Sequence, residues 1–212
     1  MIHSPINMRN QTIDNQTLIF RSEKVEPDWL VRCTVSNCEV ILEEPCWANF
    51  LNSTFRGCNF NTKKLCAQRW MNCRWLDCKF IGEYGFNLGS RDDLFDLESG
   101  PMVVGCDLSQ TALECVIVNA DLPTIKFPRW PSITILEPGL HRAELQSLIF
   151  PAELRIWWFG ESSDAHPSYS SKTFNWDNVV RRARESKAYP QEFAPYADEV
   201  RAILGRLPYV VL

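Results

Sequence analysis

Nine cysteines in 212 residues are the first candidates for chemistry in this chain. Thiolates bind zinc or form disulfides, but zinc sites commonly contain a C-x-x-C pair, and the chain has none. A buried free cysteine behaves instead as a small hydrophobic residue. We therefore expect structural thiols, with no metal and no disulfide. Six of the cysteines share one position of the sequence pattern described below: Cys33, Cys38, Cys58, Cys73, Cys78 and Cys106.

Histidines and acids could also catalyse a reaction or bind a cation. None of the three histidines belongs to a metal-binding or catalytic motif, and the chain has no nucleophile elbow and no phosphate loop. Asp92, Asp93 and Asp96 are clustered, but their spacing is not that of a calcium-binding loop. We predict a solvated acidic loop, no catalytic residues and no cofactor.

The elements that must position these residues follow a period of five. From Cys33 to Gly82 the sequence divides into ten blocks, from CTVSN and CEVIL to CRWLD and CKFIG. The second residue of every block is polar, the third is apolar, and the fifth is often Asn, Asp or Gly. Neither a helix nor a strand places one residue in five inside, whereas a chain that turns a corner every five residues does. The third residues are Val35, Val40, Pro45, Phe50, Phe55, Phe60, Leu65, Trp70, Trp75 and Phe80.

This pattern resembles the pentapeptide-repeat family, whose motif is a small residue, a polar residue, Leu or Phe, and two variable positions. STFRG, CNFNT and CKFIG match closely, and the resemblance covers 33–82 and 106–129. It implies a right-handed quadrilateral β-helix with four blocks to a coil, so that residues twenty apart stack. Cys38, Cys58 and Cys78 would then form one column about 4.8 Å apart, with parallel Cβ directions that suit a disulfide poorly.

The expected fold is mainly β, with a helical C-terminal part. Residues 1–27 lack the motif and are predicted to cap the first coil through Ile13, Leu18 and Phe20. The predicted parts are a cap at 1–27, a β-helix at 28–130 interrupted by a loop at 83–105, and a helical subdomain at 131–212.

Helical spacing and proline punctuation indicate the elements of the C-terminal subdomain. We predict helices within 140–150, 152–159, 176–186 and 195–207. Asn175 or Thr173 is expected to cap the third of them. Trp157 and Trp158 form an aromatic cluster that suits either core packing or an exposed interface anchor.

Charge is distributed unevenly along the repeat. Lys64, Arg69, Arg74 and Lys79 occupy the second, outward position of successive blocks, so a four-sided coil would carry one on each side. They would form a ring rather than a patch. The ring could serve solubility or bind an anionic partner.

These observations favour a non-catalytic, cytosolic protein–protein interaction module that binds and regulates or neutralises a partner protein. The C-terminal helices offer an interface for a homodimer, and we expect no direct binding to nucleic acid or membrane. The resemblance implies an alternative, because some family members mimic DNA and bind DNA gyrase, a type II topoisomerase. Residues 28–130 hold 13 acids against 10 bases, a small negative excess for a DNA mimic.

Overall fold

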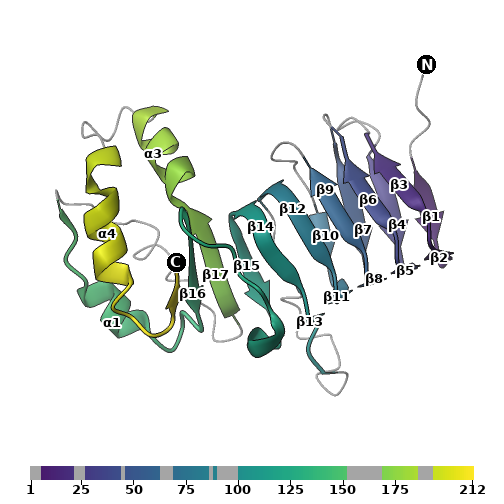
Figure 1. Ribbon diagram of the computed structural model, residues 1–212. Helices are drawn as coiled ribbons and strands as arrows, with labels where there is room; N and C mark the ends of the chain where they lie inside the picture. The colour runs from purple at the N-terminus through teal and green to yellow at the C-terminus, as the bar shows by residue number, and fades with distance from the viewer. Residues whose placement is uncertain are drawn as a thin grey trace.

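The computed structural model describes residues 6–21, 27–43, 46–62, 69–85, 88–89, 100–151, 169–185 and 193–212, in which the chain winds into a stack of parallel coils (Figure 1). Three parallel sheets form three sides of the stack. The first contains β1 (Asn7–Arg9), β4 (Asp28–Val31), β7 (Ala48–Leu51) and β10 (Arg69–Met71). The second contains β2 (Thr12–Asp14), β5 (Thr34–Ser36), β8 (Thr54–Arg56), β11 (Arg74–Leu76) and β13 (Val103–Val104). The third contains β3 (Thr17–Phe20), β6 (Glu39–Leu42), β9 (Asn59–Thr62), β12 (Lys79–Tyr84) and β14 (Asp107–Leu113).

The register of the central coils repeats every twenty residues. Val40 pairs with Phe60, and Phe60 pairs with Phe80. The parallel β-solenoid expected from the period of five is therefore confirmed. Each coil donates and accepts its backbone hydrogen bonds through the next coil, as a stack of this kind requires.

Stacked aromatic rings fill the interior of the solenoid. Phe55 and Trp75 lie with ring centroids 4.6 Å apart and planes within 8°, and Phe60 and Phe80 lie 4.9 Å apart within 14°. Each such pair contributes about 0.5–1.5 kcal/mol beyond the burial of its surface. The buried third-position residues are Val35, Val40, Phe50, Phe55, Phe60, Trp70, Trp75 and Phe80, while Leu65 lies outside the described residues.

The corners of the coils explain the Asn, Asp and Gly residues at the fifth position. Asn37, Gly57, Asp77 and Gly105 succeed one another along one corner, all with φ between 53° and 66°. This left-handed conformation is cheapest for Gly and tolerated by Asn and Asp. A Cβ at Gly57 would lie 2.9 Å from Oδ1 of Asn37, so glycine also makes room for the polar side chain of the preceding coil.

The solenoid begins earlier than the sequence pattern indicates. β1, β2 and β3 form a complete three-strand coil inside the segment expected to be a cap, and Ile13 pairs with Val35. The blocks INMRN, QTIDN and QTLIF carry the apolar third residue, but they begin with Ile or Gln rather than a small residue. Thr12 pairs with Thr34, two residues beyond the usual repeat of twenty, so the extra residues hide the register.

The interruption of the repeat is shorter than 83–105. β12 continues to Tyr84, and β13 resumes the second sheet at Val103 beside Trp75. Leu88 is buried and bridges Ile117 in parallel. The coils before and after the interruption therefore remain in contact, through β11 with β13 and β12 with β14.

The C-terminal subdomain contains strands as well as the expected helices. Its described helices are α1 (Arg142–Ser147), α3 (Trp176–Glu185) and α4 (Ala197–Leu204), with the 3-10 turn η5 (Ala194–Tyr196). A further 3-10 turn, η2 (Leu122–Thr124), precedes the subdomain. The expected helix at 152–159 lies outside the described residues. A fourth, antiparallel sheet has the order β15 (Cys115–Val118), β17 (Tyr169–Asn175), β16 (Ser132–Leu136) and β18 (Val210–Val211).

One face of this sheet packs against the helices. Ile133, Ile135 and Phe174 share a hydrophobic core with Val200 and Leu204 of α4. Figure 1 shows α3 and α4 beyond the sheet, at the end of the molecule opposite β1. Within the described parts of the chain, no helix has the length and apolar character needed to cross a membrane.

Candidate interaction surfaces

The junction between the two parts is a continuous sheet. One edge of β15 bridges Leu88 of the solenoid, and its other edge pairs with β17 in antiparallel fashion, from Cys115 opposite Thr173 to Val118 opposite Tyr169. The C-terminal subdomain therefore adds its strands directly to β15, which follows the last strand of the third parallel sheet. It covers a strand edge that would otherwise be open to pairing with another chain.

Small polar side chains occupy one face of this sheet, and all of them are buried. The Thr134 and Thr173 hydroxyls lie 2.9 Å apart, and Asn175 Nδ2 donates to Ser132 Oγ at 3.3 Å. Such paired groups stabilise a buried layer, because an unpaired hydroxyl or amide there would be costly. The layer consists of Ser132, Thr134, Ser171, Thr173 and Asn175. Among the described residues, the Ser171 hydroxyl is the member of this layer that has no hydrogen-bond partner.

Asn175 also fixes the start of α3. Its Oδ1 accepts hydrogen bonds from the backbone N–H groups of Asp177 at 3.0 Å and Asn178 at 3.3 Å. Of the two expected caps, Asn175 is therefore the one that the structure uses. A cap at the end of β17 sets the direction in which α3 leaves the sheet.

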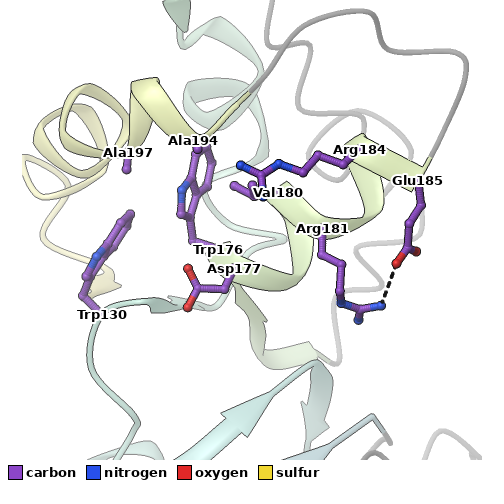
Figure 2. Close-up of a pocket in the computed structure, with 9 residues that line it drawn as sticks. All are labelled: Trp130, Trp176, Asp177, Val180, Arg181, Arg184, Glu185, Ala194 and Ala197. Atoms are coloured by element: carbon purple, nitrogen blue, oxygen red, sulfur yellow. Dashed lines mark hydrogen bonds and ion pairs between the residues drawn. The ribbon is translucent and has the colours of Figure 1, made fainter.

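A pocket of about 690 Å³ opens between α3, η5 and α4 (Figure 2). The indoles of Trp130 and Trp176 lie 6.2 Å apart with planes within 28°. The guanidinium of Arg201 sits 5.6 Å from the centre of the Trp130 ring, close enough for a cation–π interaction. The pocket is lined by Trp130, Trp176, Asp177, Val180, Arg181, Arg184, Glu185, Ala194 and Ala197.

No local sequence signal points to this pocket. Trp130 precedes the cis proline Pro131, and Trp176 is the first residue of α3. The pairing of β16 with β17 brings the two tryptophans together, since Ser132 lies opposite Asn175. This contact between distant segments depends on tertiary structure, and spacing along the chain cannot show it.

The expected basic ring is divided among three sheets. Arg69 lies in β10, Arg74 in β11 and Lys79 in β12, while Lys64 falls outside the described residues. Arg74 is half-buried, and its Nη2 donates to the carbonyl of Pro101 at 3.4 Å.

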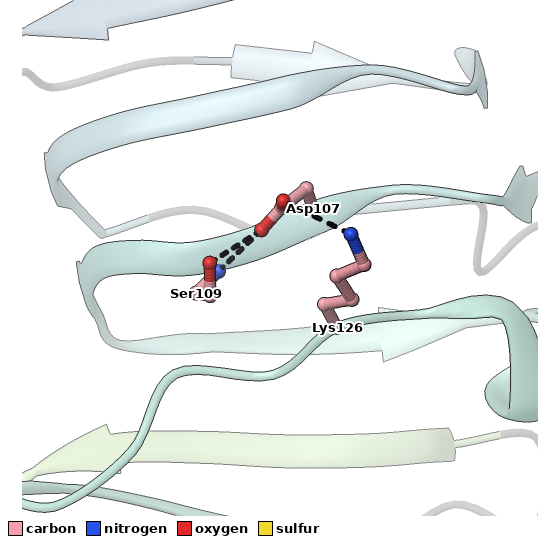
Figure 3. Close-up of polar contacts among 3 residues, drawn as sticks. All are labelled: Asp107, Ser109 and Lys126. Atoms are coloured by element: carbon pink, nitrogen blue, oxygen red, sulfur yellow. Dashed lines mark hydrogen bonds and ion pairs between the residues drawn. The ribbon is translucent and has the colours of Figure 1, made fainter.

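Charges alternate along the third sheet near Lys79. Asp107 pairs with Lys79 across the coils. Its Oδ1 accepts hydrogen bonds from the N–H and the hydroxyl of Ser109 at 3.0 and 2.6 Å, and its Oδ2 lies 3.6 Å from Lys126 Nζ (Figure 3). The hydrogen bonds from Ser109, and then the charges of Lys126 and Lys79, lower the pKa of the Asp107 carboxyl. This side of the stack is polar and locally neutralised.

The other candidate residues named from the sequence cannot be placed. Asp92, Asp93 and Asp96 of the acidic cluster lie outside the described residues, and so do Trp157 and Trp158.

The eight cysteines in the described residues are free and buried. Burial raises the pKa of the Cys73 thiol to about 12 and raises that of Cys115. Hydrogen bonds with Cys106 and Cys58, together with burial, raise the pKa of Cys78 well above its usual value. These three thiols are therefore poor nucleophiles. In the part of the chain that the structure describes, no group of His, Cys, Asp or Glu side chains is arranged to hold a metal ion.

No protein-family model, curated protein or solved structure matches this chain. What can be stated of the protein is its fold, a parallel β-solenoid joined to an antiparallel sheet with short helices.

Proposed function

We propose that this protein is a pentapeptide-repeat-type interaction module of the cytosol, without catalytic activity, which binds and regulates or neutralises a partner protein. The observation that carries the proposal is the alignment of outward side chains into columns on a hydrogen-bonded stack. Along the second sheet, for example, Thr12, Thr34, Thr54 and Arg74 occupy equivalent positions. A surface fixed before binding loses little conformational entropy when a partner docks.

The repeat geometry supports the family assignment within this proposal. Left-handed corners recur at Asn52 and Asn72 and again at Gly57 and Asp77, five residues later in each coil. Small residues fill the inward first position, as at Cys58 and Cys78. Both features agree with the block pattern of the sequence.

Affinity capture with the full-length protein tests the proposal. Tagged protein and a Thr34→Arg, Asn59→Arg variant, altered at exposed outward positions of β5 and β9, are each incubated with extract of the native host, and bound proteins are identified by mass spectrometry. We expect one protein that the parent retains and the variant loses, while both melt at similar temperatures. Failure to retain any protein specifically, together with a monomeric elution volume, would contradict the proposal.

Inhibition or protection of DNA gyrase is the weaker alternative. A DNA mimic needs closely spaced negative charge, but the aligned positions of the third sheet carry Glu39, Asn59, Lys79 and Asp107 in succession. A supercoiling assay with added protein distinguishes the two functions. A dose-dependent change in supercoiling would favour the alternative.

A further inference from the structure

The pocket between α3 and α4 is an open site with an aromatic wall and a charged rim. We propose that it receives a segment of the partner protein in which an aromatic side chain is followed by an acidic one. This inference rests on the proposed function in that it takes the occupant to be a protein. It adds where the partner binds and what chemistry the partner presents.

The wall of the pocket suits a planar apolar group. Trp176 is buried and Trp130 is half-buried, and Val180 extends the apolar surface between them and the rim. Ala194 and Ala197 supply the facing side, where small side chains leave the space open. An aromatic side chain in this space would contact chiefly the half-buried Trp130 indole, by stacked or edge-to-face packing. Tryptophan in a pocket is also a typical source of binding energy at protein interfaces.

The rim carries two bases, Arg181 and Arg184, and two acids, Asp177 and Glu185. Arg181 pairs with Glu185 at 3.5 Å and so is largely neutralised. Arg184 has no hydrogen bond or ion pair with any residue that the structure describes, and Figure 2 shows its side chain reaching across α3 toward Trp176. Arg201 adds a further positive charge beside Trp130, whereas Asp177 is the acid on the rim that Arg181 does not pair with. A carboxylate next to the aromatic group would meet Arg184 and complement this charge.

The exposure of the rim favours a protein segment over an enclosed small molecule. Asp177, Arg181, Arg184 and Glu185 are all exposed at the mouth of the pocket. A ligand buried in the pocket would leave these side chains in water, whereas a larger body seated on the rim would use them. Such an arrangement, with an anchor in the centre and charges around it, is typical of protein interfaces.

Peptide titration of the full-length protein tests the assignment without the natural partner. The probe is acetyl-Phe-Asp-amide, observed through the indole N–H resonances in two-dimensional NMR, with Trp130→Phe used to assign the Trp130 signal. We expect the Trp130 and Trp176 signals to shift with the probe and to shift far less with acetyl-Phe-Lys-amide or acetyl-Ala-Asp-amide. Arg184→Glu should weaken binding on the order of tenfold. Arg142→Glu, at an exposed position of α1, is the matched control and should leave binding unchanged.

Three results would overturn the inference. They are unmoved indole signals, equal responses to all three dipeptides, and tighter binding of free phenylacetate than of the acidic dipeptide. Circular dichroism of Arg184→Glu guards against a folding defect. Because the titration needs no partner, its failure would leave the proposed function standing. Conversely, failed capture alongside a selective titration would count against the proposed function alone.

Discussion

Asp28 places a buried carboxylate where the next coil has a small residue. It pairs with Ala48 across the first sheet, yet its Oδ1 accepts a hydrogen bond from the backbone N–H of Ile6 at 2.6 Å and its Oδ2 accepts one from that of Arg21 at 3.2 Å. Both donors flank the first coil, one at each end of it. A single side chain thus holds the first coil against the second.

We predict that Asp28→Ala destabilises the protein by about 2–4 kcal/mol, because two backbone donors lose a charged acceptor. Denaturation in urea measures the change. Asp14→Ala is the matched control, since Asp14 is exposed and bonds only to Asn15 and Asn37 among the contacts described. A loss for Asp28→Ala no larger than that of the control would contradict this role.

Tyr209, directly before β18, makes a partly buried contact with the segment that contains α1. Its hydroxyl donates to Glu144 Oε2 at 2.8 Å, and its ring stacks on His141 with centroids 3.5 Å apart. Burial, followed by the hydrogen bond and charge of Glu144, raises the pKa of Tyr209 to about 12. The phenol must therefore stay protonated for the contact to persist.

The raised pKa predicts a loss of stability at alkaline pH. Because the folded-state pKa exceeds the ordinary value of 10.0, the contribution is complete below pH 10 and disappears as pH rises through about 12. We expect Tyr209→Phe to be less stable than the parent by about 1 kcal/mol at pH 7, and the difference to vanish toward pH 12. Melting curves of both proteins across this range measure it. A difference that stayed constant with pH would contradict the prediction.

At the scale of the element, outward and inward positions alternate along the short strand β9. Phe60 and Asn59 are neighbours in β9, but Phe60 is fully buried against Phe80 and Trp75 while Asn59 is exposed. Placing the same new side chain at each of the two positions therefore separates the effect of an inward side chain on stability from that of an outward one.

Phe60→Glu should unfold the stack at 25 °C, because it removes ring packing and buries a charge without a partner. The total stability of a domain is only about 5–15 kcal/mol, which such a change approaches. Asn59→Glu should alter stability by less than about 0.5 kcal/mol. Circular dichroism and thermal melting distinguish the two variants. A cooperative transition in Phe60→Glu at the parent temperature would show the register to be wrong.

The elements differ in how far the sequence predicts them. The central coils are predictable because each block has its own inward residue and its own corner, such as Phe55 and Gly57. The first coil is concealed by two additional residues before Asp28. β17 is concealed because its buried face carries Ser171, Thr173 and Asn175, which resemble a solvated strand in the sequence. The pocket depends on pairing between distant strands, and so no local pattern predicts it.

For the whole molecule, β17 is the element that joins the two hydrophobic cores. It lies between β15 of the solenoid and β16 of the subdomain. Lys172 is central, opposite Val116 on one side and Ile135 on the other. Disrupting β17 should therefore separate the subdomain from the stack.

We predict that Lys172→Pro detaches the subdomain and exposes the edge of β15, because proline removes a donor and interrupts a central strand. Light scattering coupled to size-exclusion chromatography should then show dimers or larger aggregates. Lys172→Ala retains the backbone N–H and should show the same elution volume and mass as the parent protein. An unchanged elution volume for Lys172→Pro would show that the junction does not depend on β17.

The regular register also makes the length of the molecule adjustable in fixed steps. Thr34, Thr54 and Arg74 succeed one another every twenty residues, so a duplication or deletion of twenty residues here keeps the inward and outward positions in register. Each step changes the separation of the two ends by about 4.8 Å. The first coil shows that other lengths can be accommodated between strands, because Thr12 still pairs with Thr34, twenty-two residues further along the chain. The number of coils thus sets the distance between the two ends of the solenoid, and this distance can vary without a new fold.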